Sequence, residues 1–183
     1  MTDSIQTSNQ TYGTGIRRLH WLLFGLLSLQ YLLVWMFGWF ADRGSSHDWV
    51  VATHKSVGVV ILLVAAALLV SRLAGGRPSN ASLPGWQQRL SVTVHGLIYL
   101  LMLAQPVIGV LMTMDAGHSV PLFGLFTIPP LIAEDSAPSW LFSAHGYVGW
   151  TLFWLIALHI VAALYHRLLR RDGVLDRMLP GRT

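Results

Sequence analysis

The chain is predicted to be all-α, a transmembrane four-helix bundle that forms one integral-membrane domain over residues 1–183. Of its 183 residues, 54% are apolar and only 11% are charged, a composition that is not typical of a water-soluble domain. Four apolar segments are long enough to cross a hydrocarbon core of about 30 Å, and polar loops separate them. These two observations indicate a multi-pass membrane protein.

The helices are expected at about residues 18–40, 51–71, 92–114 and 144–167. The first is too long for a signal-peptide core and lacks an A-x-A cleavage motif, so we expect it to be retained as an anchor. Residues 73–91 are rich in Gly, Pro and Ser and are expected to form a flexible connection. Residues 120–132 are apolar but interrupted by prolines, so we expect an interfacial lid that does not span.

Positive charge is distributed unevenly along the predicted topology. Ten of the twelve Lys and Arg residues fall on the side of the two termini, which predicts that both termini are cytoplasmic. The net charge of +4 therefore reflects topology and contact with anionic lipid. No DNA-binding or RNA-binding motif is present, so nucleic acid is not an expected partner. The ten residues are Arg17, Arg18, Arg72, Arg77, Arg89, Arg167, Arg170, Arg171, Arg177 and Arg182.

Several redox chemistries are excluded by composition. The chain contains no cysteine, which rules out disulfides, cysteine-ligated iron–sulfur clusters and covalent c-type haem. It also lacks the glycine patterns of Rossmann and P-loop nucleotide sites. Any redox cofactor must be held without a covalent bond, and electrons must come from a small molecule or another subunit.

Two histidines in the last apolar segment suggest what the bundle holds. His145 and His159 are fourteen residues apart, which places both on one helix face, about 21 Å apart along the axis. An ionisable side chain in the membrane is costly and indicates a partner or a function. Two such residues at opposite depths suggest two cofactors stacked across the bilayer.

Two other histidines match these depths. His20 is expected at the cytoplasmic end of the first helix and His54 at the outer end of the second. The pairs His54 with His145 (outer) and His20 with His159 (inner) could each hold a flat macrocycle as iron ligands. A lone membrane histidine is more often an interhelical hydrogen-bonding residue, but four matched in depth favour ligands. Zinc or copper would be expected to use a different donor set, so haem b fits better.

A glycine follows each outer histidine by one helical turn. Gly58 comes four residues after His54, and Gly149 four residues after His145. The missing side chain could leave room for a porphyrin edge. Close helix packing through small residues explains the same pattern equally well.

Other polar residues are candidates for substrate contact. Lys55 could attract an anionic donor to the outer site, or its side chain could snorkel to the membrane surface. His95 and His166 could hydrogen-bond a quinone and relay protons; their alternative role is an interfacial hydrogen bond. Arg17 and Arg18 could bind haem propionates or anchor lipid headgroups.

Several segments together resemble the bacterial cytochrome b561 family over nearly the whole chain. They are Arg17-Arg18-Leu-His20-Trp21, His54-Lys-Ser-Val-Gly58, Gln105-Pro106-Val-Ile-Gly109, the spacing of His145 and His159, and the tail Asp172-Gly-Val-Leu-Asp-Arg177-Met-Leu-Pro180. The resemblance implies four transmembrane helices and two haems b ligated at His20, His54, His145 and His159. It also implies location in a bacterial inner membrane.

The short, stand-alone proteins that this chain resembles are superoxide oxidases. The resemblance therefore implies transfer of electrons from periplasmic superoxide through the haems to ubiquinone, as a superoxide:ubiquinone oxidoreductase. One alternative is a haem-b electron-transfer subunit that links a hydrogenase or another dehydrogenase to the quinone pool. A second is a haem-free membrane scaffold. The oligomeric state and the need for a partner subunit are left open by the sequence.

Overall fold

The computed structural model describes residues 11–40, 44–75, 83–131 and 140–179. Its long helices are α1 (Thr14–Phe40), α2 (Ser45–Gly75), α3 (Gly85–Asp115) and α4 (Trp140–Tyr165). A short π-helix, η1 (His166–Arg170), extends α4, and a 3-10 turn, η2 (Leu175–Arg177), follows it. The described residues contain four helices that are long and apolar enough to cross a membrane. The predicted transmembrane four-helix fold is confirmed.

α2 and α3 extend beyond their predicted limits at both ends. α2 continues to Gly75 and α3 already begins at Gly85, so part of the connection expected at residues 73–91 is helical. The apolar stretch shows only where lipid surrounds the helix. Once a helix is nucleated, each further residue adds a backbone hydrogen bond at little cost, so it continues into the polar residues at the membrane surface.

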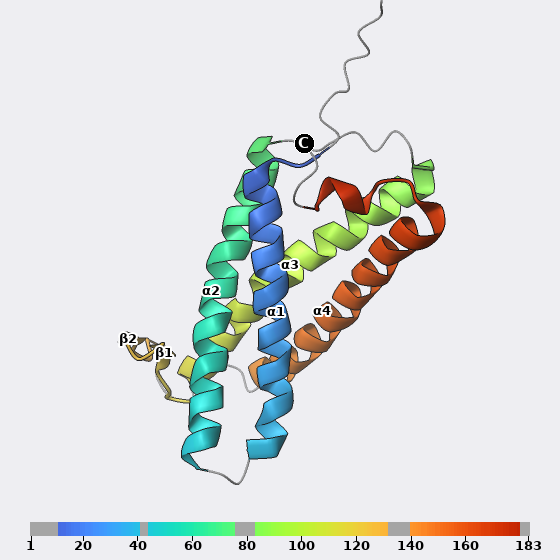
Figure 1. Ribbon diagram of the computed structural model, residues 1–183. Helices are drawn as coiled ribbons and strands as arrows, with labels where there is room; N and C mark the ends of the chain where they lie inside the picture. The colour runs from blue at the N-terminus through green and yellow to red at the C-terminus, as the bar shows by residue number, and fades with distance from the viewer. Residues whose placement is uncertain (1–10, 41–43, 76–82, 132–139, 180–183) are drawn as a thin grey trace, which may run out of the picture.

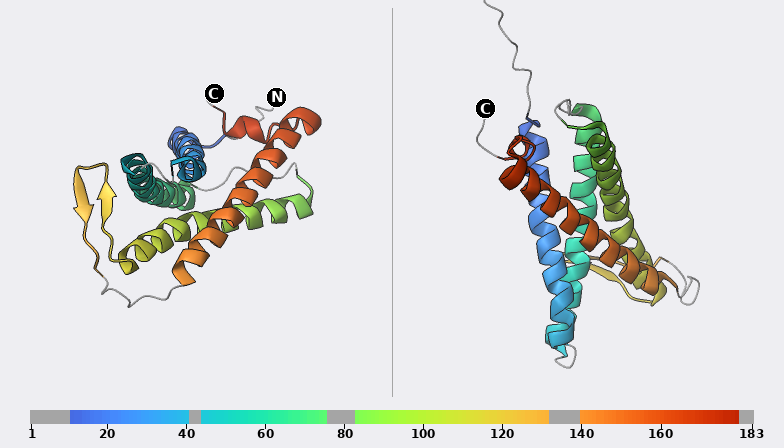
Figure 2. Two further views of the ribbon diagram at one scale, coloured as in Figure 1. Left: turned by 90° about the horizontal axis from the view of Figure 1, so that it is seen from below. Right: turned by 90° about the vertical axis from the view of Figure 1, so that its right-hand side faces the viewer.

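The helices pack as two antiparallel pairs. α1 and α2 lie side by side, whereas α3 and α4 are strongly tilted relative to them (Figures 1 and 2). α2 packs against both α1 and α3, and α3 packs against α4. The buried core between them includes Leu23, Leu33, Ile61 and Leu152. Many large apolar side chains elsewhere on the helices are exposed, as expected of surfaces that contact lipid.

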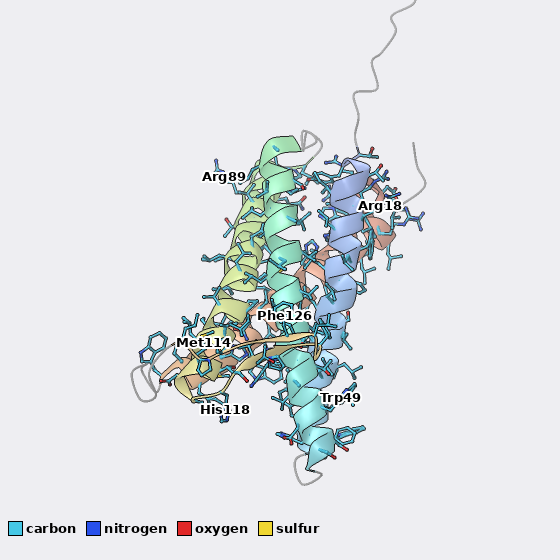
Figure 3. The ribbon with its side chains drawn as sticks, turned by 90° about the vertical axis from the view of Figure 1, so that its left-hand side faces the viewer. Arg18, Trp49, Arg89, Met114, His118 and Phe126 are labelled. Carbon is cyan, nitrogen blue, oxygen red and sulfur yellow. The ribbon has the colours of Figure 1, made fainter. Side chains whose placement is uncertain are left out.

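The two ends of the bundle differ in charge. α1 and α3 begin at the end where α2 and α4 finish, and Figure 3 shows Arg18 and Arg89 there. Trp49 and His118 lie toward the opposite end. We call these the arginine end and the hairpin end. The described arginines all belong to the arginine end, and they are Arg17, Arg18, Arg72, Arg89, Arg167, Arg170, Arg171 and Arg177.

The hairpin end takes its name from a short antiparallel β-hairpin, in which β1 (Val120–Leu122) pairs with β2 (Phe126–Ile128). Its turn contains Phe123 and Gly124, both with positive φ, of 50° and 74°. The segment expected as an interfacial lid is therefore not a spanning helix, and its hairpin is the only β-structure among the described residues of a chain predicted to be all-α. Local pairing of two short apolar strands satisfies backbone groups that the prolines prevent a helix from satisfying.

Candidate functional site

One histidine pair lies toward the hairpin end. The rings of His54 on α2 and His145 on α4 have centroids 6.2 Å apart and planes at 82°. Phe37 of α1 packs edge-on against His54, with ring centroids 5.2 Å apart. The structure thus brings together the two residues that were predicted to share the outer site.

Each histidine of this pair contacts a glutamine from the preceding helix. The Gln30 amide nitrogen donates to the His54 carbonyl oxygen at 3.1 Å and lies 3.4 Å from His54 Nε2. The Gln105 amide nitrogen donates to the His145 carbonyl oxygen at 2.9 Å and lies 3.3 Å from His145 Nε2. The sequence interpretation gave neither glutamine a role and named only Gln105, as part of a family-like motif, although an amide within an apolar span is a signal of internal contact.

The glycines near these histidines face side chains at close range. A Cβ on Gly58 would lie 3.5 Å from Gln30 Nε2, and one on Gly149 would lie only 2.9 Å from Gln105 Nε2. A Cβ on Gly109 would lie 2.9 Å from His145 Cε1. In this structure the space beside Gly58 and Gly149 therefore admits the glutamine amides.

The second pair lies toward the arginine end. His20 on α1 and His159 on α4 have ring centroids 6.2 Å apart and planes at 72°. His95 of α3 is closer still to His159, with centroids 4.9 Å apart. The His95 Nδ1 lies 2.6 Å from the Ser91 carbonyl oxygen, which fixes the orientation of its ring. The imidazoles of His20, His95 and His159 therefore lie close together toward this end.

The shared spacing of the two predicted pairs suits one metal ion between each pair. Two imidazole nitrogens that each bind a metal at about 2.0–2.1 Å place their ring centroids roughly 6 Å apart. The 6.2 Å separations match this value, whereas 4.9 Å between His95 and His159 is too short. Imidazole nitrogens are common ligands of haem iron, so the donor chemistry of each pair fits a haem b that His54 with His145, or His20 with His159, would hold.

The C-terminal residues fold back over the arginine end. The Arg17 guanidinium donates to the Leu179 carbonyl at 2.9 Å, and the Trp21 indole donates to the Met178 carbonyl at 2.8 Å. The Tyr12 backbone N–H donates to the Arg177 carbonyl at 3.2 Å. We call residues 171–179 the C-terminal clasp. Arg17, predicted to bind propionate or lipid, is engaged by this clasp, while Arg18 is exposed.

Charged contacts hold the clasp to η1. The His166 Nδ1 lies 2.6 Å from Asp172 Oδ2, and Arg170 Nε donates to the same oxygen at 3.1 Å. Burial raises the pKa of Asp172, but hydrogen bonds from His166, the Val174 N–H and Arg170 outweigh it and lower that pKa below its ordinary value. Each of these hydrogen bonds favours the ionised carboxylate.

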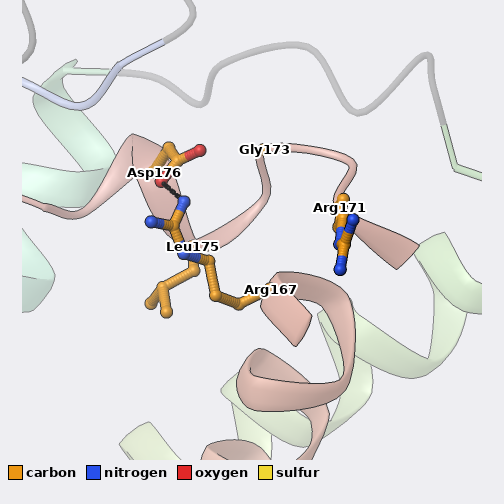
Figure 4. A pocket seen from close by; sticks show the side chains of 5 residues that line it. All are labelled: Arg167, Arg171, Gly173, Leu175 and Asp176. Atoms are coloured by element: carbon orange, nitrogen blue, oxygen red, sulfur yellow. Dashed lines mark hydrogen bonds and ion pairs between the residues drawn. The ribbon is translucent and has the colours of Figure 1, made fainter. Parts of the chain in front are cut away.

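A cavity of about 320 Å³ lies beside these contacts, where the Arg167 guanidinium pairs with Asp176 across 2.5 Å (Figure 4). Its lining also includes Arg171, Gly173 and Leu175.

Lys55, the remaining predicted contact residue, is partly buried on α2 directly after His54. The structure therefore separates Lys55, at the hairpin-end pair, from His95 and His166, which belong to the arginine end.

Comparison with known proteins identifies the family. The family model described as prokaryotic cytochrome b561 matches residues 11–181. Cytochrome b561 homolog 1 of Escherichia coli is 27% identical, with 90% of this chain and 94% of that protein covered. The probable superoxide oxidase CybB of Yersinia pestis is 29% identical, with 88% and 92% covered. Cytochrome b562 of Cereibacter sphaeroides is 24% identical, with 88% and 90% covered.

The match over nearly the whole chain accords with the membrane-spanning helices and with the paired histidines. The chain belongs to the prokaryotic cytochrome b561 family, whose members are haem-b electron-transfer proteins of the membrane.

Proposed function

We propose that this protein oxidises superoxide on one side of a bacterial inner membrane and reduces ubiquinone from the other. The observation that carries the proposal is the presence of two histidine pairs with the same 6.2 Å spacing, joined by α4. His54 with His145, and His20 with His159, would each hold one haem b. A bound haem supplies a one-electron carrier at each pair, so the two together connect the membrane surfaces.

The arginine end is proposed to face the cytoplasm and the hairpin end the periplasm, following the positive-inside rule. Lys55 next to His54 would then raise the local concentration of the superoxide anion near the periplasmic pair. The proposal gains support from the relative of 29% identity that is named a probable superoxide oxidase.

Quinone reduction is proposed at the arginine end because it needs protons as well as electrons. Two superoxide anions lose one electron each and leave as two O₂, while one ubiquinone gains two electrons and two protons to become ubiquinol. His95, beside His159, and His166, hydrogen-bonded to Asp172, are titratable groups suited to deliver protons. Arg18 is exposed and is assigned to lipid headgroups or a haem propionate.

A second function is favoured by one surface feature. The β-hairpin exposes Phe123, Leu125 and Phe126, and a partner protein could cover this apolar surface. The chain would then be an electron-transfer subunit that links a dehydrogenase or hydrogenase to the quinone pool. Purified protein alone would not turn over.

The deciding experiment is stopped-flow absorbance of the purified, oxidised protein mixed with superoxide, with and without ubiquinone. We expect fast haem reduction and then quinone-dependent reoxidation. Superoxide that has been consumed by superoxide dismutase before mixing is the control and should give no reduction. Haem that is present but remains oxidised would contradict the proposal and favour the partner-dependent subunit.

A further inference from the structure

One arginine at the arginine end lacks the partners that a buried charge needs. Arg72 lies near the end of α2, which runs beside the start of α1 (Figure 1). Its guanidinium nitrogens Nε and Nη1 are buried, and neither has a hydrogen-bond partner in the described part of the chain. Such atoms are destabilising, most of all on a charged group, and they are few in native structures. Arg72 is therefore a candidate for binding an anion.

Arg72 lies at about the same level of the bundle as His20. A Cβ on Gly75 would lie 3.5 Å from Ile16 Cδ1, so the end of α2 faces this part of the antiparallel α1. Three residues back along α2 from Gly75, at Arg72, correspond to three residues forward along α1, which ends next to His20. Arg72 also interacts electrostatically with the His20 imidazole. The guanidinium therefore lies close to the arginine-end histidine pair.

The register of α2 directs Arg72 toward the interior of the bundle. Arg72 follows His54 by eighteen residues, which is about five full turns, so both side chains leave the same face of α2. The two residues are about 27 Å apart along the helix axis. Arg72 thus occupies, at the arginine end, the face of α2 that carries a histidine at the hairpin end.

An aromatic ring holds the guanidinium in place. The Arg72 Cζ lies 4.3 Å from the centroid of the Tyr12 ring. Tyr12 is in turn fastened to the C-terminal clasp, because its N–H donates to the Arg177 carbonyl. Stacking covers one face of the guanidinium and leaves N–H groups at its edge for binding in the plane, which suits a carboxylate or a phosphate.

The charge around Arg72 is not balanced by the described residues. Arg17, one turn before His20 on α1, also has a buried Nε without a hydrogen-bond partner among them. The carboxylates of the clasp are engaged by residues of η1 instead. Buried positive charge is costly unless an opposite charge lies close to it. An anion is therefore expected beside these two arginines.

We propose that Arg72 binds a propionate of the haem that His20 and His159 hold. This inference rests on the proposed assignment of a haem to that pair. Haem b carries carboxylates, its propionates, at one edge of the ring. The unpartnered nitrogens are buried, which favours an anion inside the bundle over a lipid headgroup at its surface. The contact uses only N–H groups that are free in the structure, so it does not compete with the ligation of iron.

An arginine that pairs with a propionate also acts on the iron. Positive charge near the iron favours the ferrous over the ferric state, and neutralising a propionate acts in the same direction. The midpoint potential of the arginine-end haem should therefore depend on Arg72. The potential of the hairpin-end haem should not, because His54 is about 27 Å away along α2.

The test is redox titration of the purified full-length chain. Arg72→Gln is made in the wild type and in a His54→Ala background, where only the arginine-end haem is expected. We expect this haem to be retained and its equilibrium to move roughly tenfold toward the ferric state, which lowers its potential by about 59 mV for one electron. Arg72→Lys retains the charge and should recover part of the shift.

Arg89→Gln is the matched control, because Arg89 is an exposed arginine at the same end of the bundle (Figure 3). It should leave both potentials unchanged. An unchanged potential in Arg72→Gln, or an equal shift in both haems, would overturn the proposal.

Redox-difference infrared spectroscopy identifies the anion itself, using haem with isotope-labelled carbon in its propionate carboxyl groups. The bands that respond to the label should differ between the wild type and Arg72→Gln, but not between the wild type and Arg89→Gln. A shift in potential with unchanged label-sensitive bands would overturn the proposal and assign Arg72 to another anion, such as a lipid phosphate. If Arg72→Gln does not fold, Tyr12→Leu, which removes the stacking ring but keeps the charge, should change the same bands.

This inference and the proposed electron donor can fail separately. The titration uses neither superoxide nor ubiquinone, so a protein that does not react with superoxide would still show the shift. Retention of both haems in His20→Ala and His159→Ala would overturn the ligand assignment and this inference with it.

Discussion

The two histidine pairs have the same spacing but different surroundings. At the hairpin end, His54 and His145 are each contacted by one glutamine amide. At the arginine end, His159 contacts a third imidazole, that of His95, at 4.9 Å. Helix packing therefore sets the same separation between two imidazoles twice, while the neighbouring side chains differ between the two ends. Under the proposed function, the hairpin end would carry electrons alone and the arginine end electrons together with protons.

The peripheral segments at the two ends are also fastened differently. The β-hairpin is attached through the buried Ser56 hydroxyl, which lies 2.9 Å from the Pro121 carbonyl and accepts from the Phe123 N–H at 3.0 Å. The C-terminal clasp depends on charged pairs between partly exposed side chains. The charged pairs of the clasp respond to pH and salt, whereas the hydrogen bonds of the buried Ser56 hydroxyl do not.

Substituting one histidine of either pair should have the largest effect. His54→Ala or His145→Ala should abolish the haem at the hairpin end, and His20→Ala or His159→Ala the haem at the arginine end. Haem per chain, measured by the pyridine haemochrome assay, should fall from two to one because an iron with a single protein ligand is weakly held.

The matched control is His47→Ala, because His47 also lies on α2 but is more exposed and near Asp48. Both haems should remain in it. A bis-histidine spectrum with two haems in all four ligand variants would contradict the assignment.

The next effect concerns the third imidazole. His95→Leu should keep both haems but slow quinone-dependent reoxidation by about 10²-fold, the lower range for loss of a proton-transfer group. Reduction by superoxide at the other end should keep its wild-type rate. Stopped-flow absorbance separates the two phases. Loss of a haem in this variant would show that His95, not its neighbour His20, is the partner of His159.

A smaller effect is expected from the charge at the hairpin end. Lys55→Gln should lower the rate constant of haem reduction by superoxide about tenfold at low ionic strength and weaken its dependence on salt. Lys55→Arg retains the charge and should behave like the wild type. Equal rates for the Gln and Arg variants over a range of salt concentrations would exclude electrostatic attraction by this residue.

The smallest effect concerns the clasp. The pKa of Asp172 is lower in the folded than in the unfolded chain, so its stabilisation is complete above the unfolded value and is lost as the pH falls through the folded value. Wild-type thermal stability should therefore fall on acidification below about pH 4. Asp172→Asn should be less stable at neutral pH, by about 1–2 kcal/mol, with a weaker acid dependence.

Thermal unfolding followed by intrinsic fluorescence at several pH values measures this effect. Asp48→Asn is the control, since the Asp48 side chain is 85% exposed and should contribute little. If the thermal stability of the wild type and of Asp172→Asn changed with pH in the same way, the Asp172 carboxylate would not be what holds the clasp.

The sequence by itself determined the membrane-spanning helices and which histidines lie at the same depth. Both follow from local rules: a helix must satisfy its own backbone in lipid, and its rise per residue converts sequence separation into depth. The family resemblance read from the ordered motifs was confirmed by the match to residues 11–181. Which residues ligate haem, and the direction of the termini, stay predictions.

Only the tertiary structure decided what surrounds the paired histidines. Gln105 meets His145 across 40 residues, Ser56 meets Pro121 across 65, and Arg17 meets Leu179 across 162. No periodicity within one helix encodes such contacts, because they depend on the rotation and tilt of helices that pack against each other. The β-hairpin was missed for a related reason, since its strands are too short to show alternation and its position depends on a hydroxyl in α2.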